Sequence, residues 1–219
     1  MMRKITSTIM VTIMMVLTLG MFTACSMGQP LDVAVTIDGY DLTIGSSVAD
    51  LLAAGFDIGE TGHPSSKIYE SDYDTIPART IQSVGRYYIL KDGKSSEVAI
   101  QLVNKSNQDK LISECTIYSI EFNLYYYEYG SEERLDVAIA GVDVTTASLD
   151  DILDALTEKG CKFDADEVEG MHSSDPYGTS VTSDRVCDYV YLVTREYDMS
   201  TGEIGFGEFH MYQVIDYEY

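Results

Sequence analysis

The chain has 219 residues, of which 36 are acidic and 14 are basic, and this gives a formal net charge of −22 at neutral pH. Such a charge repels nucleic acid and the anionic head groups of lipids, so the composition argues against a nucleic-acid or phosphate ligand. It suits a cationic partner or a bound divalent ion, or it serves solubility alone.

Residues 1–24 have the composition of an export signal. A short positive segment, Met1–Lys4, precedes an apolar stretch from Ile5 to Leu19, and small residues follow at Thr23-Ala24. This order predicts a cleaved secretory signal peptide. The alternative is an uncleaved membrane anchor over residues 5–24, which is long enough to span a bilayer but is diluted by threonine and serine.

The cut site, Thr23-Ala24-Cys25, resembles the bacterial lipobox, although Phe22 stands where leucine is usual. The resemblance implies a lipoprotein whose Cys25 is acylated and becomes the N-terminus, like surface lipoproteins of clostridial, single-membrane bacteria. Several acyl chains anchor durably, so the expected location is the extracytoplasmic face of the cell membrane, with the membrane as a partner through Cys25. Residues 25–32 would form a tether that reaches about 25 Å at most.

The rest of the chain repeats itself. The pattern Val33-x-Val35-x-Ile37-Asp38-Gly39 recurs 102 residues later as Leu135-x-Val137-x-Ile139-Ala140-Gly141. Ser47–Leu52 then parallels Ser148–Leu153, and a glycine followed by a Phe-Asp pair ends each stretch. This shared order predicts two tandem copies, at residues 33–129 and 133–219.

Each copy predicts two strands and then a helix. Residues 33–37 alternate apolar and small or polar side chains as a half-buried strand does, and Gly39 permits a bend into a strand over residues 41–44. Ser47 and Ser148 each stand three residues before an aspartate, a capping-box-like start for helices of about nine to twelve residues. Gly55 and Gly160 are expected to end these helices.

Longer strands follow. We predict a hairpin of residues 86–91 and 97–103 through Asp92-Gly93, and another of residues 188–196 and 204–216. An extra strand is expected over residues 116–127. It would place Tyr118, Ile120, Phe122 and Leu124 on one face and Ser119, Glu121 and Asn123 on the other. The sequence thus predicts an α+β fold with a helix packed on antiparallel sheet in each half, either as separate domains or as one shared sheet.

Tyrosine is abundant, with 17 residues, whereas tryptophan is absent. Tyr125, Tyr126, Tyr127 and Tyr129 end the extra strand, and consecutive tyrosines on a strand must point both ways. Tyrosine offers rigid amphipathic contact area for a protein or glycan. We therefore expect an interaction patch here, with ordinary strand tyrosines as the alternative.

Catalytic motifs are missing: the chain has no Gly-x-Ser-x-Gly and no His-Glu-x-x-His. His63 and His172 lie in corresponding loops of the two copies. They could form a binding site built from both loops, or they could simply occupy equivalent positions of the duplication in exposed loops. The first hypothesis is a non-catalytic module for a protein or cell-envelope glycan ligand. The second is a cell-envelope hydrolase with a site at His63 and His172.

No cofactor or metal is predicted. Once Cys25 is acylated, the remaining Cys115, Cys161 and Cys187 lack the close pairs of a zinc site, so buried thiols are expected, with one disulfide and a spare thiol as the alternative. Residues 164–170 begin like a calcium loop, but Glu169 stands where glycine is needed.

Overall fold

The computed structural model describes residues 33–69, 72–82, 85–129, 133–171, 180–184, 188–198 and 203–213. The predicted signal peptide, Cys25, His172 and Cys187 lie outside these ranges. Within them, no helix combines the length and the apolar character that crossing a membrane requires.

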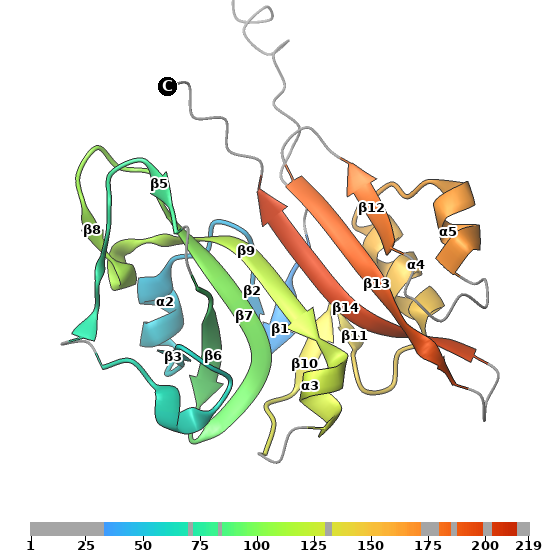
Figure 1. The fold of residues 1–219 in the computed structure, drawn as a ribbon, viewed down its shortest axis with the longest axis horizontal. Helices are drawn as coiled ribbons and strands as arrows, with labels where there is room; N and C mark the ends of the chain where they lie inside the picture. The colour runs from blue at the N-terminus through green and yellow to red at the C-terminus, as the bar shows by residue number, and fades with distance from the viewer. Residues whose placement is uncertain are drawn as a thin grey trace, which may run out of the picture.

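The fold is α+β and rich in sheet (Figure 1). The elements of the first half are β1 (Val35–Ile37), β2 (Tyr40–Leu42), α2 (Val48–Ala53), β3 (Asp57–Gly59), the 3₁₀ helix η1 (Pro64–Ser66), β4 (Thr75–Ile76), β5 (Thr80–Ile81), β6 (Tyr87–Lys91), β7 (Lys94–Asn104), β8 (Lys110–Leu111), the 3₁₀ helix η3 (Ile112–Glu114), β9 (Thr116–Asn123) and α3 (Leu124–Tyr129). The second half contains β10 (Val137–Ile139), β11 (Val142–Asp143), α4 (Leu149–Glu158), α5 (Ala165–Met171), β12 (Ser180–Asp184), β13 (Asp188–Asp198) and β14 (Glu203–Gln213).

Two short hairpins form a four-stranded sheet in the order β11-β10-β1-β2. Asp38 and Gly39 turn the first hairpin with φ of 49° and 79°, and Ala140 and Gly141 turn the second with 51° and 89°. Positive φ at both central residues is the type I′ geometry that matches strand twist. The predicted bend at Gly39 is therefore confirmed as a tight hairpin turn.

The two hairpins meet through an antiparallel pair of β1 and β10. Val35 lies opposite Ile139, and Ile37 lies opposite Val137. The small sheet thus joins a strand from the start of the described chain to one about a hundred residues later.

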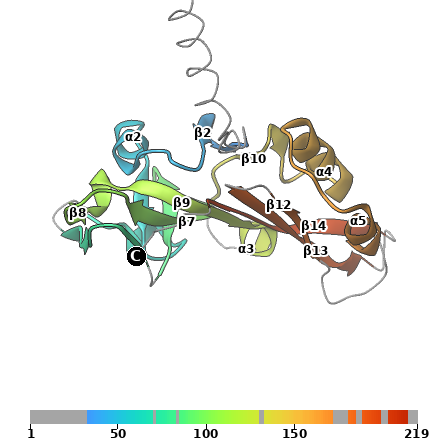
Figure 2. The ribbon, with the colours of Figure 1, turned by 90° about the horizontal axis from the view of Figure 1, so that it is seen from above.

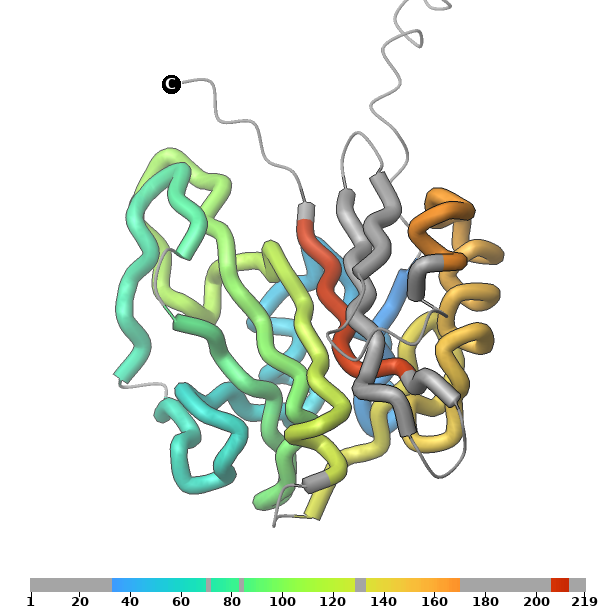
Figure 3. The backbone as a smooth tube through the Cα atoms, turned by 45° about the vertical axis from the view of Figure 1, so that its right-hand side comes forward, coloured from blue at the N-terminus to red at the C-terminus, as the bar shows by residue number. Residues whose placement is uncertain are grey.

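A second sheet of eight strands runs β12-β13-β14-β9-β7-β6-β3, with β5 beside β7. β14, from the second half, pairs with β9, from the first, and the two segments lie side by side in Figure 3. The halves therefore share one sheet. The predicted hairpins β6–β7 and β13–β14 are both present in it.

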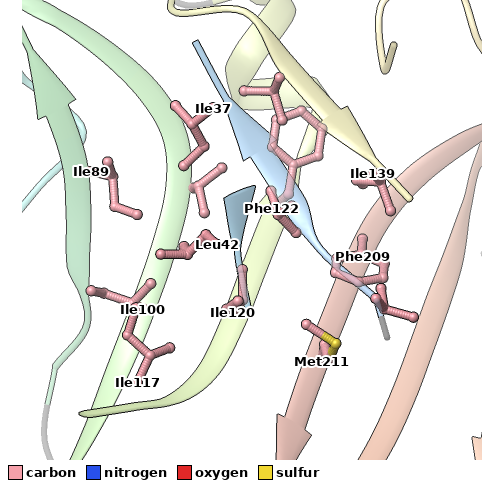
Figure 4. Close-up of a cluster of buried hydrophobic side chains, with 14 of the residues drawn as sticks. Ile37, Leu42, Ile89, Ile100, Ile117, Ile120, Phe122, Ile139, Phe209 and Met211 are labelled. Carbon is pink, nitrogen blue, oxygen red and sulfur yellow. The ribbon is translucent and has the colours of Figure 1, made fainter. Parts of the chain in front are cut away.

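The elements form two layers. Helices α2 and α4 and the small sheet lie on one side of the large sheet (Figure 2). Ile37 and Ile139 from the small sheet point toward Phe122 and Phe209 of the large sheet, and all four are at most 1% exposed (Figure 4). Burial of these apolar faces holds the layers together, at roughly 25 cal/mol per Å² removed from water.

One of the two predicted helices has the expected length of about nine to twelve residues, and the other is shorter. α4 has ten residues and begins with a full capping box, in which Ser148 Oγ accepts from the N–H of Asp151 and the Asp151 carboxylate accepts from Ser148. α2 has only six residues, and Ser47 makes no side-chain cap hydrogen bond. It is shorter because Gly55, with φ of 86°, ends it immediately.

The prediction of strand through residue 127 was wrong. β9 ends at Asn123, and residues 124–129 form α3. Asn123 Oδ1 accepts from the N–H of Tyr126 at 3.3 Å, and Arg134 donates to the carbonyl oxygens of Tyr126 and Tyr127 at 3.1 and 3.3 Å. Capping of both ends favours a helical turn over the strand propensity of tyrosine.

The calcium-like segment forms part of a helix. The Asp164 carboxylate accepts from the N–H groups of Asp166 and Glu167 at 2.9 and 3.3 Å, which makes Asp164 the cap of α5. Its oxygens are thus engaged by the helix N-terminus.

Candidate binding site on the open face of the large sheet

The face of the large sheet that turns away from α2 and α4 carries α3 at one end (Figure 2). On this face one row runs over four strands: Tyr88 lies opposite Ala99, Ala99 opposite Glu121, and Glu121 opposite His210. Opposed residues in antiparallel strands have Cβ atoms about 5 Å apart. The row therefore brings together side chains that are more than a hundred residues apart in sequence.

A pocket of about 230 Å³ is centred on this row. Its walls come from β6, β7, β9, α3 and β14. The lining residues are Arg86, Tyr88, Glu97, Ala99, Glu121, Phe122, Asn123, Tyr126, Glu208 and His210.

Carboxylates dominate the charge of this first pocket. Arg86 pairs with Glu121 at 2.6 Å. His210 lies between two carboxylates, with Nδ1 3.5 Å from Glu121 and Nε2 3.1 Å from Glu208. Asn123 donates from its amide to Glu208 at 2.5 Å. Among the described residues, the Glu208 carboxylate thus contacts the Asn123 amide and the His210 imidazole, whereas the Glu121 carboxylate pairs with the Arg86 guanidinium.

Tyrosines supply aromatic walls. Tyr126 is 61% exposed at the rim. Tyr88 is half-buried, and burial, followed by the charge of Glu97, raises the pKa of its phenol. Tyr88 therefore stays neutral and able to donate a hydrogen bond throughout the physiological pH range.

Glu97 and Arg134 support the pocket from behind. β7 bulges between Ser95 and Ala99, and within the bulge Glu97 adopts φ of 54°, an unfavourable conformation for a residue with a Cβ. Its carboxylate lies 2.7 Å from the Arg134 guanidinium, and both side chains are nearly buried. Because Arg134 also caps α3, this ion pair fixes the helix that carries Tyr126 to the sheet.

A second pocket, of about 330 Å³, continues along the same face and shares Glu121 and His210 with the first. Tyr118, Ser119 and Tyr212 also line it. Tyr118 and Ser119 lie together because a register shift opposite Gln101 and Leu102 places one extra residue in β9. The predicted strict alternation, with Tyr118 on the Ile120 face, was wrong for this reason.

No family model matches the chain, and no curated protein or solved structure is similar to it. The carboxylates, imidazole and phenols of the site can hydrogen-bond and attract cations, and no serine or cysteine is among the described residues that line the first pocket. In the described ranges, no three His, Cys, Asp or Glu side chains are arranged to hold a metal ion.

The predicted tyrosine patch is divided by α3. Tyr125 and Tyr126 are 59% and 61% exposed, whereas Tyr127 is buried and donates its hydroxyl to the carbonyl oxygen of Leu135 at 2.9 Å. The Tyr129 side chain lies outside the described part. Tyr126 alone of the three described tyrosines lines the first pocket.

His63 has a structural explanation. Its Nδ1 accepts from the N–H of Ser65 at 3.1 Å and so caps η1. A hollow of about 300 Å³ beside this loop is lined by Ser65 and Asp72 among others, and His63 is not part of its wall. Among the described residues, His63 thus serves the local turn and is not in the wall of this hollow.

Sequence reasoning missed Tyr88, Glu208 and His210 as site residues. Each lies in an ordinary alternating strand, where a polar residue indicates only an outward face. Their meeting depends on the strand order, and no local pattern in the sequence carries that information.

Proposed function

We propose that this chain is a non-catalytic binding module, lipid-anchored on the extracytoplasmic face of the cell membrane, which binds a protein through the open face of its large sheet. One observation carries the binding role: two adjoining pockets on the sheet face opposite α2 and α4, walled by tyrosines and carboxylates. Tyrosine-rich surfaces suit protein recognition because they offer large contact area at low entropic cost.

The layer order supports an anchor at Cys25. β1 lies in the layer opposite the open face (Figure 2). A short tether over residues 25–32 that joins β1 would direct the open face away from the bilayer, toward a partner. Mass spectrometry of the mature N-terminus tests the anchor: an acylated Cys25 is expected, and an unmodified chain that starts at Met1 would contradict it.

We also propose that residues 33–129 and 133–219 are tandem copies of one unit. The two hairpins support this, because residues at equivalent positions, Asp38-Gly39 and Ala140-Gly141, turn both with positive φ, and the corresponding strands β1 and β10 pair with each other. If Asp38 and Ala140 are equivalent, Ala140→Asp should fold with a free energy of unfolding within about 1 kcal/mol of the parent. A variant that fails to fold would count against the equivalence.

Site-specific photo-crosslinking in intact cells tests the binding role. A photo-reactive residue at Gln101, in the second pocket, should crosslink to a specific envelope protein that mass spectrometry identifies. The matched control carries the same residue at Glu158, which is exposed at the end of α4 in the other layer. Crosslinks of equal yield and identity from both positions, or none from Gln101, would rule the open face out.

A further inference from the structure

Resting on that proposed function, we infer the class of partner: the two pockets bind an extended segment with a Lys or Arg side chain in the first pocket. An apolar or aromatic side chain, two residues along the same segment from the basic one, occupies the second pocket. The recognised segment is therefore basic-x-apolar, presented by a protein.

The charges of the first pocket favour a cation. Among its described lining residues are three carboxylates and one guanidinium, that of Arg86. Arg86 neutralises Glu121, and Arg134 behind the wall neutralises Glu97. Glu208 has no Lys or Arg partner among the described residues; it contacts the amide of Asn123 and the imidazole of His210. The ammonium or guanidinium of a ligand would donate a charge-assisted hydrogen bond to the Glu208 carboxylate.

The aromatic walls strengthen the same preference. Tyr126 and Tyr88 flank the carboxylates of the first pocket. A cation within about 6 Å of a tyrosine ring is attracted by the negative face of the ring. A formal net charge of −22 adds long-range attraction for a basic partner and repels acidic ones.

The size of the pocket indicates a side chain rather than a whole small molecule. Its 230 Å³ lies below the roughly 300–1,000 Å³ typical of small-molecule sites. The second pocket begins at Glu121 and His210, where the first ends, so a longer ligand can occupy both.

The distance between the two pockets determines how far apart the two side chains of the ligand must lie. The first is centred on the row of Glu121 and His210, and the second extends to the row of Ser119 and Tyr212, two residues along each strand. Two residues of strand span roughly 7 Å. Same-side residues of an extended peptide, i and i+2, have that same spacing, so one peptide parallel to β9 can fill both pockets.

The second pocket differs in chemistry. The rings of Tyr118 and Tyr212 form its walls, and the carboxylate among its described lining residues is the shared Glu121, which Arg86 neutralises. Burial, and then Tyr212, raises the pKa of Tyr118, so that ring remains a neutral contact surface. An apolar or aromatic side chain fits there better than a charged one.

Peptide titrations test the inference. The probe is the blocked pentapeptide Gly-Arg-Gly-Phe-Gly, titrated into the purified protein from residue 26 onward and followed by NMR or calorimetry. Replacing its Arg by Glu should abolish binding. Placing Arg and Phe next to each other should weaken binding several-fold, because adjacent side chains of an extended peptide point to opposite sides.

Variants of the protein locate the site. Glu208→Gln should weaken the probe at least about tenfold, since a charge-assisted hydrogen bond contributes roughly 1.5–3 kcal/mol. Glu158→Gln removes the same charge from the other layer and should leave affinity unchanged. Tyr126→Ala should also weaken binding, whereas Tyr69→Ala, at an equally exposed tyrosine outside the pockets, should not. Circular dichroism confirms that each variant folds.

Three results would overturn the inference: no binding of the probe, equal binding of the Glu peptide, or unchanged affinity in folded Glu208→Gln. These outcomes are separate from the test of the proposed function. If Gln101 still crosslinks to one partner, the open face is a binding surface whose ligand is not basic. If Gln101 yields no partner, the binding role itself fails.

Discussion

Replacement of Arg134 by methionine should cause a large loss of stability, because this guanidinium joins three parts of the site. It lies 2.7 Å from the Glu97 carboxylate and donates to the carbonyl oxygens of Tyr126 and Tyr127. Methionine keeps the apolar stem and removes the charge. Glu97 would then be a nearly buried carboxylate without its cation, in a bulge whose backbone holds it in place.

The expected magnitude follows from burial. The Arg134 and Glu97 side chains are only 13% and 11% exposed. Breaking a buried pair from one side costs about 3–5 kcal/mol. At 2–4 °C per kcal/mol for a domain of this size, Arg134→Met should lower the melting temperature by roughly 6–20 °C. Glu97→Gln should cost less, about 1–3 kcal/mol, because Arg134 keeps two carbonyl acceptors.

A double-mutant cycle in urea measures the pair directly. Arg134→Met with Glu97→Gln should cost about 2 kcal/mol less than the sum of the single variants, since the double variant buries no unpaired charge. Additive costs, or a loss below about 1 kcal/mol for Arg134→Met, would show a solvated surface pair and refute the reasoning.

Three further predictions concern the caps, the thiols and acid stability. Ser148→Ala should cost about 1 kcal/mol in urea unfolding, and Ser47→Ala less, because only Ser148 makes a side-chain cap; equal costs would contradict this. Cys115 should resist a thiol reagent at pH 8 in the native protein, because burial raises its pKa to about 11; fast labelling, read by peptide mapping, would be inconsistent with that burial. Hydrogen bonds from Thr145 lower the pKa of Asp143, so the stability they add is present above the ordinary value of 3.8 and is lost as pH falls through the lowered value. Asp143→Asn should remove that part of the acid dependence, and superimposable acid unfolding curves would argue against it.

Local chemistry explains which parts of the fold could be predicted from the sequence. The hairpin turn at Gly39 follows from the freedom of glycine at positive φ, and the start of α4 follows from Ser148 and Asp151 three residues apart. These interactions span a few residues, so the pattern contains all the information that they need.

The features that the sequence did not predict depend on residues far apart in the chain. α3 forms because Arg134 caps it from beyond its C-terminal end, and the position of Tyr118 depends on a bulge against β7. The site itself joins Tyr88 to His210 across four strands. Strand order is set by packing of the whole sheet, so only one member of the site, Tyr126, could be anticipated, and only as part of a tyrosine cluster.

The pairing of β1 with β10 affects the order in which the chain can fold during synthesis. At about 5–20 residues per second, the hundred residues that separate the two strands take roughly 5–20 s to emerge from the ribosome. Throughout that interval β1 has only β2 beside it, and its other edge is open to pairing with a second chain. The edge of β1 is therefore a point at which two unfinished chains could pair with each other before β10 closes it.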